Sequence, residues 1–248
     1  MSSLKGKTAL VTGSTSGIGL GMAIALAKQG ANIMVNGFGE KDEAIAKIKA
    51  CGVEVDYHGA DMSKPAEIKD LIQQTEKRFG SLDILVNNAG IQHTASIEEF
   101  PTDKWDAIIA INLSSAFHTT HHALPGMKKR NWGRIINIAS VHGLVASTQK
   151  AAYVAAKHGI VGLTKVTALE NARTGITCNA IGPGFFPTAL TAPVFGDPEL
   201  VKMHANRTAI GRNGEMKDIY GLAIFLASDA SSYITGQTIM LDGGYTAT

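Results

Sequence analysis

Short apolar runs alternate with segments of helical spacing along almost the whole chain of 248 residues. The runs are rich in Val, Ile and Leu, which is typical of buried strands, and the segments between them repeat apolar residues three or four positions apart. Strands joined by helices pair in parallel through right-handed crossovers. The alternation therefore predicts an α/β fold, a doubly wound parallel sheet flanked by helices, in a single domain spanning residues 1–248.

The individual elements follow from the same pattern. We expect strands at residues 8–12, 32–36, 53–57, 82–86, 134–139, 176–181 and 238–241, and helices at residues 18–29, 41–50, 65–79, 102 to about 127, 151–171 and 215–227. Residues 185–213 carry Pro187, Pro193 and Pro198 and are expected to be irregular. Long irregular segments in compact domains often cover a substrate, so we expect a substrate lid at about 185–213.

The composition limits the classes of partner. Charged residues make up 18% of the chain, the formal net charge is +2, and no block of like charge occurs, so we expect no nucleic-acid or membrane partner. No apolar leader opens the chain, and no run is long enough to span a bilayer. Cys51 and Cys178 lie far apart without metal-ligand spacing, which favours reduced thiols in a cytoplasmic protein.

A glycine-rich turn separates the first strand from the first helix. Its glycines are Gly13, Gly17 and Gly19, a spacing that differs from the common Gly-x-Gly-x-x-Gly fingerprint. Glycines let the backbone approach a pyrophosphate closely, and the helix start supplies N–H groups. The context favours a dinucleotide site over an ordinary glycine-rich turn.

The end of the second strand bears on the choice of cofactor. A carboxylate there would hold an adenosine ribose hydroxyl, and a cation would hold a 2′-phosphate, but the segment at 36–39 is Asn-Gly-Phe-Gly. Ser16 also stands where a basic residue would meet a phosphate. This lack of positive charge favours NAD over NADP. Asp61, after the third strand, either bonds the adenine amine or caps the next helix.

Three more strands end in small or polar residues. The fourth strand leads into Asn-Asn-Ala-Gly at 87–90, the fifth into Ser140, and the sixth into Gly-Pro-Gly at 182–184. Ligands of open α/β sheets bind at the carboxyl ends of the strands. These segments and the glycine turn are therefore expected to line one crevice.

Tyr153 and Lys157 are four residues apart in an alanine-rich helical segment, so they share one face. An unperturbed tyrosine titrates near about 10, and a neighbouring Lys cation lowers that pKa. A tyrosine tuned in this way exchanges a proton with an alcohol or carbonyl oxygen, and Ser140 is placed to hydrogen-bond the same oxygen. The alternative is a packed ring beside a solvated amine.

His118, His121 and His122 cluster at helical spacing on the helix predicted at 102–127. No carboxylate or cysteine joins them, so we expect a helix-packing or subunit-contact cluster and no metal site.

In order along the chain, the segments 12–19 and 87–90, then Asn112, Ser140, Tyr153-x3-Lys157 and Pro183-Gly184, resemble the motifs of the short-chain dehydrogenase/reductase family. The resemblance covers essentially the whole chain. It implies a Rossmann-type fold, a nicotinamide cofactor and a homotetramer.

The resemblance also implies roles for individual residues. Tyr153 would transfer the proton, Ser140 would position the reacting oxygen, Lys157 would hold the nicotinamide ribose and lower the pKa of Tyr153, and Asn112 would hold a water that links Lys157 to solvent. The implied cofactor-binding residues are Gly13, Thr15, Ser16, Gly17, Ile18, Gly19, Phe38, Ala60, Asp61, Asn88, Ala89, Gly90, Tyr153, Lys157, Pro183 and Gly184.

Within this family, residues 5–170 look most like the branch that oxidises D-3-hydroxybutyrate, through segments 36–39, 88–93 and 140–147. That likeness implies that Gln92, His142 and Lys150 hold a substrate carboxylate, which suits a small hydroxy acid or keto acid. Together with Ser140, Tyr153 and Phe185, these are the expected substrate-binding residues.

The carboxyl third looks more like gluconate 5-dehydrogenase and related sugar-acid or polyol enzymes, through segments 184–193 and 210–212. Phe185 and Tyr245 stand where the D-3-hydroxybutyrate branch has tryptophans. The leading hypothesis is an NAD-dependent interconversion of (R)-3-hydroxybutyrate and acetoacetate, and the alternative is a sugar-acid or polyol dehydrogenase. A nucleotide-sensing protein without turnover is a third hypothesis, but it would not need the acid–base pair.

Overall fold

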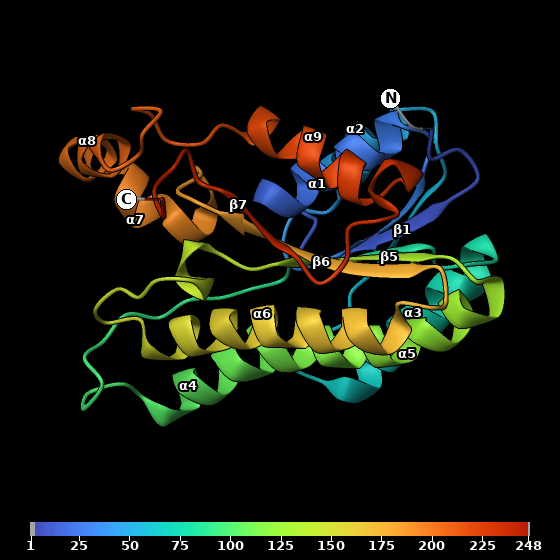
Figure 1. Cartoon of the computed structure of the whole chain (residues 1–248), viewed down its shortest axis with the longest axis horizontal. Helices are drawn as coiled ribbons and strands as arrows, with labels where there is room; N and C mark the ends of the chain where they lie inside the picture. The colour runs from blue at the N-terminus through green and yellow to red at the C-terminus, as the bar shows by residue number, and fades with distance from the viewer. Residues whose placement is uncertain (1–2, 248) are drawn as a thin grey trace.

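A sheet of seven parallel strands forms the centre of the computed structural model, which describes residues 3–247 (Figure 1). The strand order is β3-β2-β1-β4-β5-β6-β7. The strands are β1 (Thr8–Val11), β2 (Asn32–Asn36), β3 (Val55–His58), β4 (Ile84–Asn87), β5 (Gly133–Ile138), β6 (Ile176–Pro183) and β7 (Thr238–Leu241). The winding direction reverses between β1 and β4, and in such sheets the ligand crevice opens at this point.

Helices cover both faces of the sheet (Figure 1). One face carries α1 (Gly17–Lys28), α2 (Asp42–Lys49) and α9 (Met216–Leu226). The other carries α3 (Pro65–Phe79), α4 (Thr102–Ile109), α5 (Ser115–Arg130) and α6 (Ala151–Asn171). This arrangement confirms the predicted α/β class with a doubly wound parallel sheet.

Neighbouring residues of one strand pack into different hydrophobic layers. Val11 belongs to the cluster under α1 and α9, whereas Leu10 belongs to the cluster that includes Ile68, Leu71 and Ile72 of α3. A strand buried on both faces shows a continuous apolar run rather than alternation, which is why the strands were visible in the sequence.

The helix expected at 102–127 is divided by a π-helical turn, Ala110–Ser114, between α4 and α5. Asn112 lies in this turn, and its side-chain amide hydrogen-bonds both the N–H and the carbonyl of Ile91 at 2.9 Å. The extra residue in the turn accompanies this long-range contact, which no local pattern announces.

The expectation that residues 185–213 are irregular is wrong. They contain a short 3-10 turn (Ala189–Thr191) followed by α7 (Ala192–Phe195) and α8 (Pro198–Asn206). Pro193 and Pro198 lie in the first turns of these helices, where a missing N–H is tolerated, and the Asp197 side chain caps α8 by accepting from the N–H of Glu199. No residue of α7 or α8 is buried, so both helices lie over the surface of the domain.

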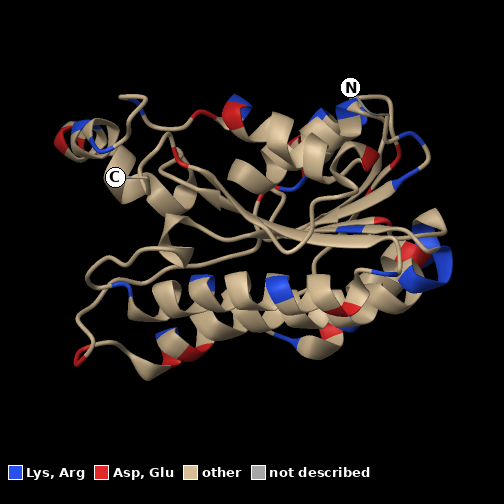
Figure 2. Cartoon of the chain, viewed as in Figure 1, with Lys and Arg blue, Asp and Glu red and all other residues tan. Residues whose placement is uncertain are grey.

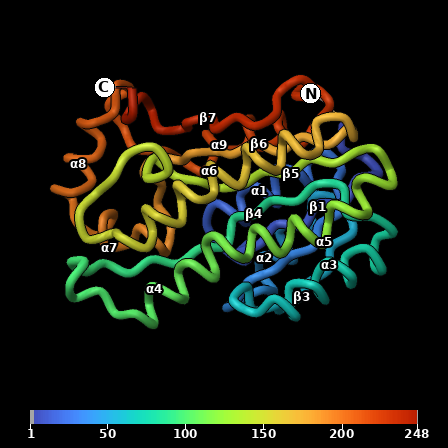
Figure 3. Tube along the Cα trace, turned by 60° about the horizontal axis from the view of Figure 1, so that its bottom comes forward, coloured from blue at the N-terminus to red at the C-terminus, as the bar shows by residue number. Residues whose placement is uncertain are grey.

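The helices α7 and α8 lie at the same end of the molecule as the loop before α4 and the loop before α6 (Figures 1 and 3). Figure 2 shows Lys and Arg interspersed with Asp and Glu over the outer helices. Among residues 3–247, no helix has the length and apolar character needed to cross a bilayer.

Candidate active site

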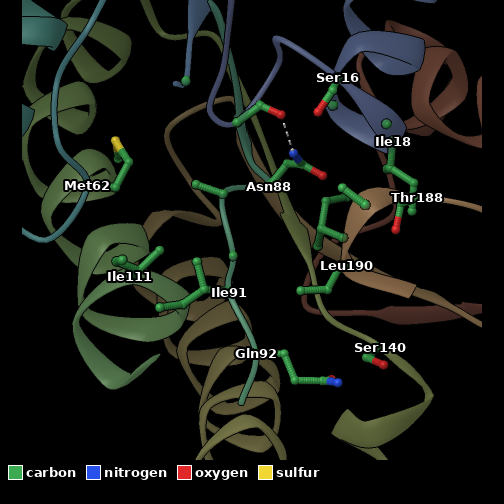
Figure 4. A pocket seen from close by; sticks show the side chains of 18 of the residues that line it. Ser16, Ile18, Met62, Asn88, Ile91, Gln92, Ile111, Ser140, Thr188 and Leu190 are labelled. Carbon is green, nitrogen blue, oxygen red and sulfur yellow. Dashed lines mark hydrogen bonds between the residues drawn. The ribbon is translucent and has the colours of Figure 1, made fainter. Parts of the chain in front are cut away.

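The glycine turn is fixed against the end of β4. Gly13 and Gly17 adopt φ values of 63° and 55°, which favour glycine, and a Cβ on Gly19 would collide with the Gly13 carbonyl and lie 2.5 Å from the Asn88 amide nitrogen. That nitrogen donates to the carbonyls of Thr12 at 2.9 Å and Gly13 at 3.1 Å (Figure 4). The backbone of the turn is thus held open and close to the crevice.

A cavity of about 540 Å³ runs along the carboxyl edge of the sheet. Every residue predicted to bind the cofactor lines this cavity. Figure 4 places Ser16 and Ile18 at one end of the cavity and Gln92 and Ser140 at the other. The cavity therefore extends from the glycine turn at one end to Tyr153 and Ser140 at the other.

Sequence analysis missed a second set of lining residues. Apolar side chains carry no motif, so only the strand-end rule and the lid expected at about 185–213 pointed to their neighbourhood. The missed residues are Asn36, Gly37, Met62, Ile91, Ile111, Ile138, Ala139, Phe186, Thr188, Ala189, Leu190 and Thr191.

Asn36 organises the adenosine end of this cavity. It is fully buried; its Oδ1 accepts from the N–H of Gly13 at 3.4 Å, and its Nδ2 donates to the carbonyls of His58 and Ala60 at 3.0 Å. Of the residues that line the cavity, Lys157 is the one Lys or Arg, and it lies at the opposite end. The adenosine end therefore presents no cation to a 2′-phosphate.

Asp61 lines the cavity, and its Oδ1 accepts from the N–H of Ser63 at 2.9 Å and the hydroxyl of Ser63 at 2.7 Å. These bonds lower the pKa of the carboxyl and fix the turn before α3. Asp61 does not cap α3, whose N-cap residue is Lys64, and a bond to an adenine amine stays a prediction.

Ser140, Tyr153 and Lys157 come together at the far end of the cavity. Ser140 follows β5, and its Oγ accepts from the N–H of His142 at 3.1 Å, while Tyr153 and Lys157 lie on the buried face of α6. The Lys157 ammonium donates to the carbonyl of Ile138 at 2.6 Å and lies 5.6 Å from the centre of the Tyr153 ring. The predicted acid–base pair is thus a buried pair beside Ser140.

The expected lowering of the Tyr153 pKa is wrong for the chain by itself. Burial raises the pKa of the Tyr153 phenol, because the phenolate loses hydration, and the Ser140 hydroxyl lowers that pKa only in part. Burial also lowers the pKa of Lys157 to about 8. The site therefore keeps the tyrosine protonated and holds an ammonium that titrates near neutral pH.

The side chain of Asn112 anchors the segment that follows β4, because both ends of its amide are bonded to the backbone of Ile91. The main-chain carbonyl of Asn112, in the π-helical turn, is the group left for the water that the resemblance implies, and that role stays a prediction.

The expected substrate residues separate into two groups. Gln92, Ser140 and Tyr153 line the cavity, whereas His142, Lys150 and Phe185 lie outside the set that lines it. His142 is buried and meets Tyr153 edge-on with ring centres 6.0 Å apart.

The titratable side chains that affect His142 are all basic. Burial is the main cause that lowers the pKa of His142 to about 4, and the charges of Lys150, His204, His158 and Arg207 lower it further. His142 is therefore a neutral imidazole at pH 7, able to donate one hydrogen bond. Lys150, at the start of α6, has its pKa lowered by burial.

The histidine cluster of α5 is an aromatic surface. His121 stacks on Phe117 with ring centres 5.8 Å apart and meets His122 edge-on at 4.9 Å. Burial lowers the pKa of His122, and the neighbouring charges lower it further. No group of three or more His, Cys, Asp or Glu within residues 3–247 is arranged to bind a metal.

Comparison with known proteins gives consistent relatives. Residues 13–246 match the family described as Enoyl-(Acyl carrier protein) reductase. The chain is 59% identical to a D-beta-hydroxybutyrate dehydrogenase of Cupriavidus necator, covering 98% of this chain and 99% of that protein. It is 50% identical to the D-beta-hydroxybutyrate dehydrogenase of Rhizobium meliloti, with 97% and 99% coverage.

Among solved structures, a gluconate 5-dehydrogenase from Burkholderia cenocepacia in complex with NADP and tartrate superposes with a TM-score of 0.95. It is 38% identical and covers 99% of this chain, which covers 97% of it in return. This neighbour carries the same fold over nearly the whole of both chains.

Proposed function

Because the chain belongs to the short-chain dehydrogenase/reductase family, we propose that it is an NAD-dependent dehydrogenase that interconverts (R)-3-hydroxybutyrate and acetoacetate. One observation carries the proposal. Ser140, Tyr153 and Lys157 form a buried group at the end of a dinucleotide-sized cavity, in a chain 59% identical to a D-beta-hydroxybutyrate dehydrogenase.

The residues present fit a nicotinamide dinucleotide. A side chain at Gly19 would collide with its surroundings, Gly13 and Gly17 have the positive φ that favours glycine, and the N-terminus of α1 faces the same cavity, which suits a pyrophosphate. When bound, the nicotinamide supplies the acceptor for a hydride from the substrate carbon. We assign NAD rather than NADP because neither Ser16 nor Phe38 offers a cation at the adenosine end.

Tyr153 is the group that moves the proton. In the oxidising direction its phenolate takes the hydroxyl proton of the substrate while the C–H bond breaks, and in the reducing direction the phenol returns that proton to the oxygen. The Ser140 hydroxyl donates to the same oxygen and holds it beside Tyr153. The Lys157 ammonium, held beside Tyr153, would stabilise the phenolate and would hold the ribose of a bound cofactor.

The substrate carboxylate is assigned to Lys150, His142 and Gln92. Lys150 supplies the cation, and neutral His142 and the Gln92 amide supply hydrogen-bond donors. Phe185, which packs edge-on against His142 at 6.5 Å, closes the apolar side of the site.

The proposal is tested by initial rates of NADH formation with (R)- and (S)-3-hydroxybutyrate and gluconate, and with NADP in parallel. We expect turnover selective for the (R)-acid with NAD. Activity on gluconate without activity on either hydroxybutyrate would contradict it.

A second candidate is a sugar-acid or polyol dehydrogenase, favoured by the fold shared with the tartrate complex of a gluconate 5-dehydrogenase. Lys150→Ala separates a hydroxy acid from a neutral polyol: it should chiefly raise the KM for (R)-3-hydroxybutyrate, whereas a neutral polyol would lose little. Gluconate also carries a carboxylate, so the rates of the wild type with gluconate decide that case.

The proposed assembly is a homotetramer of the cytoplasm, with neither nucleic acid nor membrane as a partner. Exposed apolar side chains on the outer face of α6 support it: Val166 is 52% exposed and Leu169 is 80% exposed. Sedimentation or mass photometry of the purified chain would measure the assembly, and a monomer at micromolar concentration would contradict it.

A further inference from the structure

The lid helix α8 carries two basic side chains on the face turned to the substrate end of the domain. His204 and Arg207 are three residues apart at the end of α8, so they lie on neighbouring positions of one face. The ring of His204 stacks on Phe185 with centres 3.6 Å apart, and the Arg207 guanidinium lies 4.4 Å from the centre of the Tyr245 ring. Both side chains are thereby held in place by aromatic residues.

Those two aromatic residues belong to one cluster with the substrate residues. Phe185 contacts His142 on one side and Tyr245 on the other, at ring distances of 6.5 Å and 5.7 Å. Phe185 follows β6, and Tyr245 lies near the C-terminus of the chain, which Figure 1 shows beside α7 and α8. The cluster therefore joins α8 to the group expected to bind the carboxylate.

His204 has an unsatisfied polar atom. Its Nδ1 is buried and has no hydrogen-bond partner within residues 3–247. A buried polar atom without a partner costs free energy, so it gains from a ligand that completes its hydrogen bonding.

The charges around the cluster lack a counter-ion. No ion pair among residues 3–247 includes Lys150 or Arg207. Both cations are close enough to lower the pKa of His142 and of His204, so these two rings favour the neutral form. Cations that gather without a carboxylate repel one another, and an anion between them removes that repulsion.

We propose that α8 supplies the lid half of the carboxylate site, with Arg207 as its cation and His204 as a hydrogen-bonding partner, opposite Lys150 and His142. The inference rests on the proposed function and adds to it that the lid recognises the charge of the substrate. The acid is then preferred over its uncharged ester because cations on both sides, Arg207 at the lid and Lys150 at the start of α6, attract its carboxylate.

The test compares Arg207→Gln and His204→Phe with the wild type on (R)-3-hydroxybutyrate and on its methyl ester. His204→Phe keeps the stack on Phe185 and removes the ring nitrogens. Lys202→Gln is the matched control, because Lys202 is an exposed cation of α8 only two positions from His204 and so on another face.

We expect Arg207→Gln to raise the KM for the acid about 10-fold and to leave the ester unchanged. His204→Phe should also raise the KM for the acid, and Lys202→Gln should leave the KM unchanged for both the acid and the ester. Added salt should raise the KM of the wild type more than that of Arg207→Gln. NADH affinity and thermal midpoint should match the wild type in all three variants.

Equal effects on acid and ester, or no effect of Arg207→Gln on either, would overturn the lid assignment while leaving the dehydrogenase intact. A wild type with no turnover of the acid would overturn both the inference and the proposed function. The two failures are therefore distinguishable.

Discussion

The ammonium of Lys157 donates a 2.6 Å hydrogen bond to the carbonyl oxygen of Ile138, the last residue of β5. This bond ties the helix that carries Tyr153 to the strand that ends beside Ser140. The fold itself therefore sets the position of Tyr153 relative to Ser140.

Tyr153→Phe removes the hydroxyl that transfers the proton and keeps the ring that packs in the site. We expect turnover to fall on the order of 1000-fold, because no other side chain at the site exchanges a proton with the substrate oxygen. Fluorescence titration with NADH should give an unchanged Kd. Retained turnover would remove Tyr153 from its assigned role.

The pH dependence should differ between the two directions. Oxidation needs the phenolate of Tyr153, whose pKa is raised by burial, so kcat/KM for hydroxybutyrate should rise with pH through the neutral range. Reduction needs the phenol, so its rate should decline as pH rises. Because the pKa of Lys157 is about 8, the support that its ammonium gives to the phenolate fades above that pH, and the rise should level off. Parallel profiles in both directions would contradict this assignment.

Gly19→Ala should damage the cofactor site selectively. The added Cβ would collide with the Gly13 carbonyl and crowd the Asn88 amide, so the turn must move away from its bonds to Asn88. We expect NAD binding to weaken about 10-fold or more. Gly162→Ala, on the exposed side of α6 with no atom within 4 Å of the new Cβ, is the matched control and should bind NAD normally.

Buried His142 should make the fold sensitive to acid. Its folded pKa of about 4 lies below the ordinary value of 6.5, so the unfolded chain binds more protons and stability falls as pH drops from about 6.5 towards 4. The full loss from this residue is roughly 3 kcal/mol. Urea unfolding at several pH values should show that His142→Gln flattens this dependence, and an unchanged slope would mean that other groups govern it.

Phe38→Arg should shift the cofactor preference. The adenosine end has no cation among its lining residues, and an Arg at this exposed position would meet a 2′-phosphate. We expect kcat/KM with NADP to improve at least about 10-fold. If the wild type already uses NADP as well as NAD, the absence of a cation does not decide the preference.

The sheet and the crevice could be predicted from sequence because both depend on local signals. Strands buried on two faces, such as β1 and β4, contain continuous apolar runs, and glycine or small polar residues follow them at the ligand edge. The glycine turn and the Tyr153–Lys157 spacing are likewise local. The glycine turn and the Tyr153–Lys157 pair could be placed in one crevice because the carboxyl ends of parallel strands lie at the same edge of the sheet.

What sequence could not supply comes from long-range packing. The prolines of the lid suggested irregular structure, but Pro193 and Pro198 lie in first turns of helices, and a helix start favours proline as much as a loop does. The π-helical turn at Asn112 accompanies bonds to Ile91, 21 residues away. The pKa of Tyr153 was predicted from one neighbouring charge, whereas burial by the whole domain decides its direction.

The backbone N–H of His142 occupies a lone pair of the Ser140 oxygen. The Ser140 hydroxyl keeps its hydrogen for donation to a substrate oxygen, and the bond from His142 restricts the directions in which it can point. A prochiral ketone held at its oxygen by Ser140 and at its carboxylate by cations could still turn about the line between these two points. The side from which the hydride arrives is the third point, so the handedness of the product would depend on the main chain at the end of β5 together with the glycine turn that holds the cofactor.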